Sequence, residues 1–301
     1  LLERQGWGNQ TTGGDGGVAL IASDLETLRV ALESLSPAYV TFAPGTTIAV
    51  DTPIMVKSNK TLDGRGSAVT IKGSKDITAL WLEGVENIIV SDITFDGQWP
   101  DYSSSADAKG DAVHLEGTNN IWVHHCKILH WADGAVDCRP ETLNTNISIT
   151  WNRIFEQYKL SLCWGDRFSL GYNYLNKVGF RFPMAGGQAI PNTGRVHSYN
   201  NLIEDWQKEL IQYTKAKGQI NSHRNMWVPK RTNKVNEGGV GDIIKIDTPK
   251  TYGNVTFNPT NPNVDPQFIA DSVALADLTI CNTSAEWDAL RARLIAETGP
   301  R

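Results

Sequence analysis

Short apolar segments separated by polar turns fill most of the chain. Early examples are Tyr-Val-Thr-Phe (39–42), Thr-Ile-Ala-Val (47–50) and Ala-Leu-Trp-Leu (79–82), and each is soon followed by Gly, Pro, Asn or Asp. Their apolar residues alternate or run for a few positions only, which is typical of strands and not of helices. Many short strands at even spacing predict an all-β repeat or a β-sandwich.

An internal repeat favours the first of these alternatives. Six segments between residues 87 and 227 align in one register, with an apolar residue at the second position and usually at the fourth. Their seventh positions are Ile93, Cys126, Asn152, Asn173, Asn201 and Asn225. Steps of 21 to 33 residues indicate one supersecondary unit per repeat, with insertions in the loops. The four asparagines at one repeat position predict a column of stacked amides, since each can donate to and accept from its neighbour. We therefore expect an all-β fold, a right-handed parallel β-helix, and not a sandwich with coincidental Asn-rich turns.

Two helical segments flank this repeat. Leu25, Leu28, Ala31, Leu32 and Leu35 follow helical spacing behind a capping-box pattern at Ser23-Asp24-Leu25-Glu26, which predicts an N-terminal capping helix over about 24–35. Thr283-Ser284-Ala285-Glu286 predicts a last helix through about Glu297. We expect one domain over 1–301, with coils over about 39–228 and a C-terminal tail of loops and helix over about 229–301.

The composition limits the possible partners. The formal net charge is −5 and the sequence pI about 5.7, so nucleic acid is not expected, and an acidic ligand would need a local cationic site. No apolar run approaches the roughly 18 residues of a membrane span. The four cysteines lack the spacing of a zinc site and favour buried free thiols over disulfides, which leaves the redox compartment undecided. The chain starts at Leu1 like a trimmed mature end.

Carboxylates and cations come together in the predicted coils. Asp111, Asp133 and Asp137 lie on short β-type segments, and the repeat places Asp111 one coil before Asp133, 22 residues earlier. The same register places Lys159 and Arg181 on the next two coils, about 4.8 Å apart per coil. Carboxylates this close repel each other unless a cation joins them, and ligands that are all oxygen favour Ca²⁺. The sequence therefore predicts a calcium site with a cationic continuation.

These residues, together with motifs along most of the chain, resemble the pectate lyases of polysaccharide lyase family 1. The motifs are Thr-Thr-Gly-Gly (11–14), Thr-Leu-Asp-Gly-Arg-Gly (61–66), Gly-Asp-Ala-Val (110–113), Asn-Ile-Trp-Val-His-His-Cys (120–126), Ala-Asp-Gly-Ala-Val-Asp (132–137), Arg-Phe-Pro (181–183) and Val-His-Ser-Tyr-Asn-Asn (196–201). The resemblance implies a parallel β-helix, in agreement with the repeat.

The resemblance also implies roles for the site residues. It assigns Asp111, Asp133 and Asp137 as calcium ligands, Lys159 as the substrate-binding lysine of the catalytic set, and Arg181 as the catalytic base. The family usually has a second arginine shortly after Arg-x-Pro, where this chain has Met-Ala-Gly-Gly (184–187). Either Arg195 binds substrate in its place, as we expect, or one substrate contact is missing.

The implied activity is calcium-dependent β-elimination of 4-linked galacturonan to unsaturated oligogalacturonides. The expected partner is an acidic polysaccharide, with no nucleic acid and no membrane, and the protein is expected to be a secreted monomer. Three alternatives remain: a pectin lyase acting on methyl-esterified chains without metal, a non-catalytic carbohydrate-binding β-helix, and a glycoside hydrolase on the same fold, which would need paired carboxylates on either side of the bond.

Overall fold

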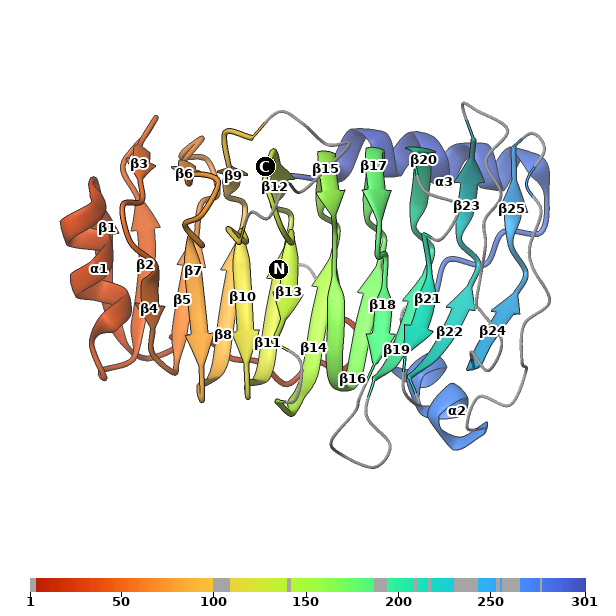
Figure 1. Cartoon of the computed structure of the whole chain (residues 1–301), viewed down its shortest axis with the longest axis horizontal. Coiled ribbons are helices and arrows are strands. Elements are labelled where there is room, and N and C mark those ends of the chain that lie inside the picture. Colours follow the sequence, from red (N-terminus) through yellow and green to blue (C-terminus); the bar gives the residue numbers. More distant parts are fainter. Residues whose placement is uncertain are drawn as a thin grey trace.

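The computed structural model describes residues 4–99, 109–139, 142–186, 194–207, 211–215, 218–229, 243–252, 255, 266–276 and 278–301. Its strands wind into a parallel β-helix, in which successive coils add strands to three long sheets (Figure 1). The predicted fold class is confirmed.

Each sheet contains strands that are not consecutive in the chain, because every coil visits the sheets in turn. Sheet A contains β1 (Val18–Ala22), β2 (Ala38–Phe42), β5 (Lys60–Asp63), β8 (Glu86–Ser91), β11 (Asn119–His124), β14 (Asn144–Thr150), β16 (Leu162–Gly171), β19 (Arg195–Tyr199), β22 (Gln219–His223) and β24 (Ile243–Asp247). Sheet B contains β3 (Thr47–Ala49), β6 (Thr70–Lys72), β9 (Thr94–Asp96), β12 (Lys127–Leu129), β15 (Arg153–Lys159), β17 (Tyr174–Phe180), β20 (Leu202–Trp206), β23 (Met226–Val228) and β25 (Lys250–Thr251). We use the name sheet C for β4 (Ile54–Val56), β7 (Leu80–Glu83), β10 (Val113–Glu116) and β13 (Val136–Cys138) with the start of β16, β18 (Met184–Gly186) and β21 (Tyr213–Lys215), which continue it.

The interior is filled by identical positions of successive coils. In sheet A, Val40, Leu62, Val90, Val123 and Ile149 are register partners from strand to strand, and all are buried. Burying each such side chain is worth roughly 1.5–3 kcal/mol, so the stack stabilises the coil-to-coil register.

The asparagine column is present as predicted. The Oδ1 atom of Asn173 accepts from the backbone N–H of Asn152 at 2.9 Å, and Asn173 in turn donates to Oδ1 of Asn201. Asn201 repeats both bonds with Asn225, and Cys126 donates its N–H to Asn152 at the first position of the column. All four asparagines are buried.

The β-helix is longer than predicted at both ends. β1 precedes the expected first coil at residue 39, and β24 and β25 follow the expected last one at 228. β1 was missed because it follows the glycine-rich entry segment directly and four of its five residues are exposed, so no alternation marks it. Much of the predicted tail, including 230–242 and 256–265, lies outside the described residues.

Both predicted helices are confirmed, with one correction. Helix α1 (Leu25–Glu33) covers one end of the β-helix, but its capping box joins Asp24 and Thr27, not Ser23 and Glu26. Helix α3 (Ser284–Glu297) begins at the predicted Thr283–Glu286 box. Helix α2 (Pro266–Leu275) was not predicted.

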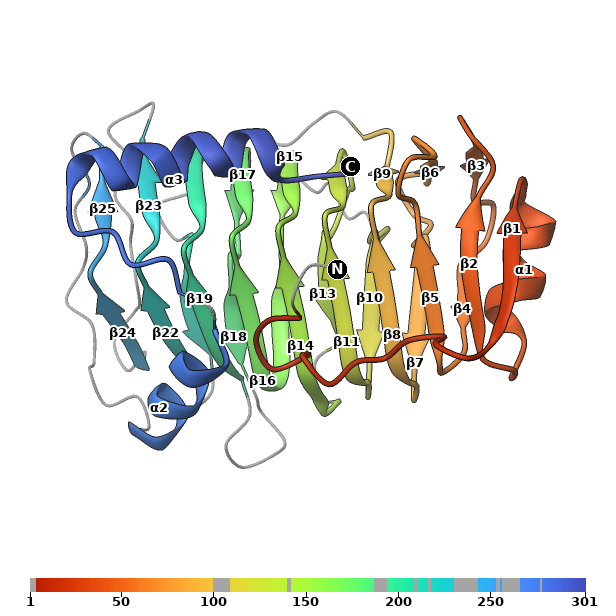
Figure 2. The same cartoon turned by 180° about the vertical axis from the view of Figure 1, so that it is seen from behind.

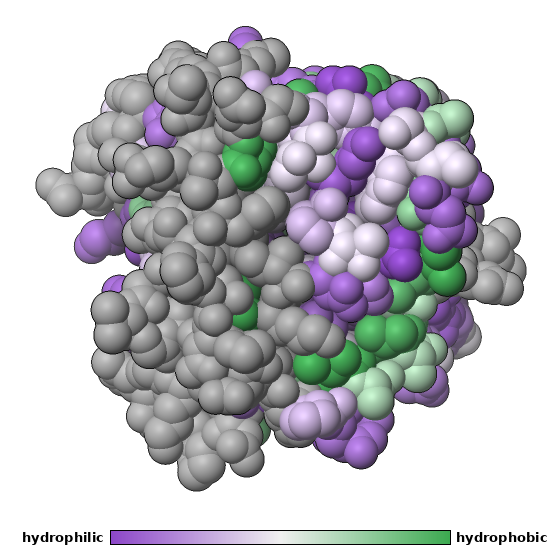
Figure 3. Space-filling view, turned by 90° about the vertical axis from the view of Figure 1, so that its right-hand side faces the viewer, coloured by the Kyte–Doolittle hydropathy of each residue, from purple (hydrophilic) through white to green (hydrophobic). Residues whose placement is uncertain are grey.

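Helix α3 lies along the outside of the coils, across β15 to β25 (Figures 1 and 2). Trp287, Leu290 and Leu294 are buried in one cluster with Trp151 and Tyr172. Figure 3 shows the molecule from the end that carries α2, where the described surface is mixed in hydropathy. Most of its apolar residues lie in the lower half of this view, on the side of α2. No helix among the described residues is long and apolar enough to cross a membrane. The four cysteines are buried free thiols, as predicted.

Candidate functional site

A groove of about 760 Å³ runs over the outer face of sheet C. It is lined by charged residues from successive coils: Lys109, Asp111, Asp133, Asp137, Arg139, Lys159, Arg181 and Lys215. Acidic groups lie on the earlier coils and Arg181 and Lys215 on the later ones, so the charge of the groove changes along the axis of the helix.

Strand alternation explains which residues reach this face. In β10 and β13, Val113 pairs with Val136 and Leu115 with Cys138, and all four are buried in the core. The residues between them, His114 and Asp137, are register partners and point outward into the groove.

The three predicted carboxylates meet at one place. One oxygen from each of Asp111, Asp133 and Asp137 lies within 4.8 Å of the others. The predicted alignment is shifted by one position, because the backbone N–H of Asp133 donates to Gly110 O, while Gly134 N–H donates to Asp111 Oδ1 at 2.6 Å. The coil assignment of the carboxylates is confirmed.

Each carboxylate is held by a neighbour. Asp111 Oδ2 lies 2.9 Å from His114 Nδ1, Asp133 Oδ1 accepts from Lys159 Nζ at 2.7 Å, and Asp137 Oδ1 accepts from the Leu162 N–H. The second oxygens of Asp133 and Asp137 have no hydrogen-bond donor among the described residues. They are the atoms left to bind a ligand.

The electrostatics of the cluster favour a cation. Burial raises the pKa of Asp111, and the negative charge of Asp133 raises it further, against the hydrogen bond from His114. Burial also raises the pKa of Asp137 well above its ordinary value, and the charges of Asp111 and Asp133 add to the effect, while Arg181 opposes it. Positive charge placed between the three groups would relieve this repulsion.

The donor set fits calcium. Among the residues that the structure describes, only carboxylate oxygens converge here, and the imidazole of His114 is turned to Asp111 through Nδ1. Oxygen ligands with room for water or substrate oxygens suit Ca²⁺ better than zinc or copper.

Lys159 and Arg181 follow the carboxylates as predicted. Lys159 in β15 pairs with Phe180 in β17, so Arg181 comes directly after the strand that neighbours Lys159. Arg181 donates through Nε to Tyr213 Oη at 3.3 Å and lies over the Phe180 ring, and it bonds no carboxylate of the described chain. Gln157 donates to the carbonyl oxygens of Asp133 and Lys159, which holds the acidic loop and the lysine together.

Arg195 is not brought to this groove. Its guanidinium donates to both oxygens of Asp166, at 2.6 and 2.7 Å, and lies over Phe268 of α2. It is not among the residues that line the groove. The geometry gives no support to the prediction that Arg195 binds substrate.

The sequence analysis missed several groove residues. His114 and Trp81 are register partners with ring centroids 4.2 Å apart, and Lys215 comes from β21. Alternation within the segment Val113–Glu116, with Val113 and Leu115 as apolar core residues, could have placed His114 on the outward face. No sequence signal marked β21, because it has three residues only.

Comparisons with known proteins support the motifs and the fold. A scan against models of known protein families finds no match. Pectate lyase 5 of Ambrosia artemisiifolia is 30% identical over 185 residues, covering 54% of this chain and 44% of that protein. The chain thus spans about half the length of the curated relatives that it matches first.

Solved structures with this fold include jun a 1, the major allergen from cedar pollen, with a TM-score of 0.75 and 19% identity over 99% of this chain and 92% of that one. A pectate lyase of Bacillus sp. N165 in complex with trigalacturonate has a TM-score of 0.66, with 17% identity over 98% of both chains. Pectate lyase C of Erwinia chrysanthemi, solved at pH 9.5 with 30 mM Ca²⁺, has a TM-score of 0.64, with 15% identity over 96% of this chain and 94% of that one. The chain is thus similar to pectate lyases in sequence and shares the β-helix fold of solved pectate lyases.

Proposed function

We propose that this protein is a calcium-dependent pectate lyase that cleaves 4-linked galacturonan by β-elimination to unsaturated oligogalacturonides. One observation carries the proposal: three carboxylates with oxygens within 4.8 Å of one another lie beside Lys159 and Arg181 in a single groove. A polyuronate bears one carboxylate per sugar, so it needs both a bridging cation and direct cationic contacts.

Asp111, Asp133 and Asp137 would hold the calcium. When bound, it acts as a Lewis acid that withdraws charge from a substrate carboxylate. Asp133 and Asp137 each offer an oxygen without a described hydrogen-bond donor, and His114 fixes the orientation of Asp111. Lys159 forms an ion pair with Asp133. From this position its ammonium group can also bind a uronate carboxylate of the substrate as a point charge.

Arg181 is the group we assign to proton removal. In the reaction, the C5–H bond breaks and its proton passes to Arg181, a C4–C5 double bond forms, and the C4–O4 bond breaks as the leaving oxygen takes up a proton from water. A guanidinium normally holds its proton, so Arg181 must act from its neutral form. Tyr213 and Phe180 orient the side chain toward the groove.

The first test is an absorbance assay with polygalacturonate. Formation of a 4,5-unsaturated uronide raises the ultraviolet absorbance, and we expect a chelator to abolish the rise and added Ca²⁺ to restore it. Cleavage that survives chelation would overturn the calcium role, and new reducing ends without absorbance would indicate a hydrolase.

The same assay distinguishes the proposed activity from the alternative functions. Higher activity on methyl-esterified pectin than on polygalacturonate, without metal, would identify a pectin lyase. Binding of galacturonan without any unsaturated product would identify a carbohydrate-binding β-helix. The carboxylate cluster and Lys159 favour the charged substrate.

The proposal includes secretion and a monomeric state, because the substrate is an extracellular polymer and a groove open along the coils needs no second copy. Finding the protein in the culture medium of its producing cells, and a monomer mass by light scattering, would support both points.

A further inference from the structure

Charged side chains are bonded to one another at the edge of sheet B, where each coil turns toward sheet C. His130 Nδ1 lies 3.0 Å from Asp96 Oδ1, and His130 Nε2 lies 3.0 Å from Glu156 Oε2. Lys177 Nζ donates to the other oxygen of Glu156, Oε1, at 2.8 Å. These four residues come from four successive coils, and none of them lines the groove over sheet C. We call this continuous chain of contacts the charge ladder.

Three members of the charge ladder occupy the same position of the repeat. The residues just before them in β12, β15 and β17 are register partners, so His130, Glu156 and Lys177 are equivalent in their coils. Each has a left-handed backbone, with φ of 59°, 45° and 54°. Residues other than glycine adopt this conformation rarely, and they keep it where surrounding contacts hold it. The bonds of the charge ladder are contacts of this kind.

Each of these three positions comes shortly before a residue of the candidate site. The site residue follows after three or four residues in each coil: Asp133 after His130, Lys159 after Glu156, and Arg181 after Lys177. Beyond the charge ladder, β15 and β17 are paired again through Gln157–Val178 and Lys159–Phe180. This short paired segment leads directly into Lys159 and Arg181, so the spacing that the charge ladder sets is passed on to both.

Contacts in the interior link the same turns. Gln157, the next residue of β15 and fully buried, donates to the carbonyl oxygens of Asp133 and Lys159 at 2.8 Å each. The Ser161 N–H donates to the carbonyl oxygen of Arg181 at 2.7 Å. These inner bonds fix the turns to one another, and the charge ladder fixes the strands from which the turns start.

Glu156 is the member on which the charge ladder depends, because it bonds both of its neighbours. Hydrogen bonds from Lys177 and from His130 lower the pKa of Glu156, so its carboxylate keeps its charge in mild acid. The side chains of Glu156 and Lys177 are 36% and 46% exposed, and such pairs contribute little to global stability. Breaking the charge ladder should therefore displace the turns more than it destabilises the fold.

We propose that Glu156 is a positioning residue, which sets the spacing of the three turns of the site by bridging His130 and Lys177. This role rests on the proposed function, because these turns carry the residues assigned to calcium binding and proton removal. Glu156 touches no reacting atom in this role and acts through the backbone of the neighbouring coils. Reacting groups must be held close to their productive geometry, so a small displacement of the turns lowers the rate.

Steady-state kinetics on polygalacturonate test this role. Glu156→Ala removes both bonds and should lower kcat roughly ten-fold with KM changed less, since a misplacement of about 1 Å can cost about 10²-fold. Glu156→Gln keeps the size of the side chain and one acceptor oxygen, and it should recover part of the loss. Glu297→Ala breaks a comparably exposed ion pair with Arg293 on α3, outside the charge ladder and the groove. It is the matched control and should behave as wild type.

A double-mutant cycle tests the bridge itself. Lys177→Ala should lower kcat less than Glu156→Ala does, because the bond between Glu156 and His130 remains. If Lys177 acts on the site through Glu156, adding Lys177→Ala to Glu156→Ala should lower kcat no further. Additive losses, or an unchanged kcat for Glu156→Ala, would overturn the proposal.

Hydrogen exchange measured by mass spectrometry reports on the turns without substrate or metal, and so separates this role from the proposed function. In Glu156→Ala, amides of the turns beyond the charge ladder, such as that of Ser161, should exchange roughly five-fold faster, as expected for the loss of an exposed ion pair. Exchange in the asparagine column should be unchanged. Unchanged exchange in the turns would overturn the role of Glu156. If the wild type forms no unsaturated product, the lyase proposal fails, yet the exchange rates still decide whether Glu156 holds the turns.

Discussion

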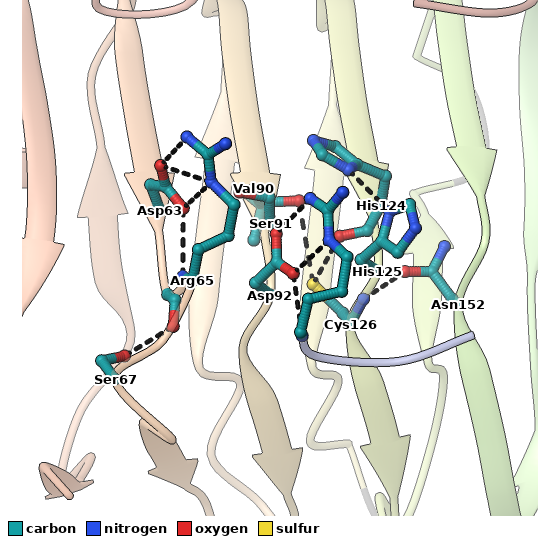
Figure 4. A network of polar contacts seen from close by, with 12 residues as sticks. Asp63, Arg65, Ser67, Val90, Ser91, Asp92, His124, His125, Cys126 and Asn152 are labelled. Atoms are coloured by element: carbon teal, nitrogen blue, oxygen red, sulfur yellow. Dashed lines mark hydrogen bonds and ion pairs between the residues drawn. The ribbon is translucent and has the colours of Figure 1, made fainter. Parts of the chain in front are cut away.

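Two outer faces of the β-helix bury charge in different ways. On sheet A, Arg65 donates to both oxygens of Asp63, and Arg301 donates to both oxygens of the fully buried Asp92. Figure 4 shows Asp63 and Asp92 at the ends of neighbouring strands, beside His124 and His125. On sheet C, the buried Asp111 and Asp137 have no arginine or lysine bonded to them in the described chain.

The pKa shifts express this difference. Burial would raise the pKa of Asp63, but hydrogen bonds from Arg65 and Tyr39 lower it to about 2. Burial and neighbouring carboxylates raise the pKa of Asp111 and Asp137. Compensated charge is typical of structural pairs, whereas uncompensated charge in a groove indicates a place for a ligand.

The largest effect should come from Arg181. Arg181→Ala removes the proposed base and should lower kcat by about 10²–10⁴-fold, because general acid–base catalysis contributes about that much. The change in absorbance with time on polygalacturonate measures it. Arg65→Ala, which removes a cation from the sheet A face, is the matched control and should leave kcat within about two-fold while lowering thermal stability.

A loss of activity by Arg65→Ala equal to that of Arg181→Ala, with both proteins folded, would contradict the division between the two faces. Circular dichroism of both variants at the assay temperature establishes that they are folded.

The extent to which the sequence predicted these faces depends on repetition. Asn152, Asn173, Asn201 and Asn225 could be aligned because every coil needs the same buried amide, so the pattern recurs. Lys159 and Arg181 followed from the same register and from the family motif. Each of these residues is fixed by a contact with a neighbouring coil.

Arg195 and the elements that were not predicted lack such repetition. Arg195 was chosen by its charge and its place in the sequence, but Asp166 holds it outside the groove. Lys215 resembles any exposed lysine, and only the pairing of β21 with β18 shows that it reaches the groove. Helix α2 begins at Pro266, and the Asp-Pro pair at 265–266, a typical helix-start signal, was overlooked in the sequence.

The amide column offers a third, uncharged way of burying polar groups, and the next largest effect should be found there. In Asn173→Ala, the N–H of Asn152, the side-chain amide of Asn152 and the carbonyl of Ile149 each lose a partner. Since an unsatisfied buried group costs about 1–3 kcal/mol, we expect a loss of roughly 3 kcal/mol in the free energy of unfolding. Urea unfolding measures it.

The surface-facing Asn176→Ala is a suitable control, although it loses hydrogen bonds to Tyr174 and Glu204. Its loss should stay below that of Asn173→Ala, because Asn176 is only partly buried. Equal losses would show that the column has no special role in stability.

Lowering the pH should change the free energy of unfolding in opposite directions through the titrating groups of the two faces. Burial lowers the pKa of His125 and of His197, both on the sheet A side, to about 3, so the unfolded chain binds protons there before the folded one as pH falls below about 6.5. Each such histidine removes up to about 1.4 kcal/mol of stability per pH unit between about 6.5 and 3. The raised pKa values of Asp111 and Asp137 act in the other direction, because the folded chain binds protons there first and gains stability as pH falls toward the ordinary carboxyl range.

Urea unfolding in chelator between pH 7 and 4 can separate the two contributions. His197→Gln should flatten the loss of stability in acid, and Asp137→Asn should steepen it, since it removes the opposing group. Identical pH slopes for both variants and wild type would contradict the assignment of these two groups to the pH dependence.

The smallest effect is expected at the rim of the groove, where a cation is already paired. Arg139 is 59% exposed and bonds Glu116 at 2.9 Å, a kind of surface pair that typically contributes about 0–1 kcal/mol. If a cation that is already paired with a carboxylate has a structural role only, Arg139→Ala should change KM for polygalacturonate less than about two-fold. The free energy of unfolding should fall by less than about 1 kcal/mol. Glu116→Gln is the informative partner variant, because it frees the arginine without removing it and should lower KM slightly by adding an unpaired cation to the groove. A rise in KM for Arg139→Ala of more than about five-fold would show that pairing in the free protein does not decide which cations bind the polymer.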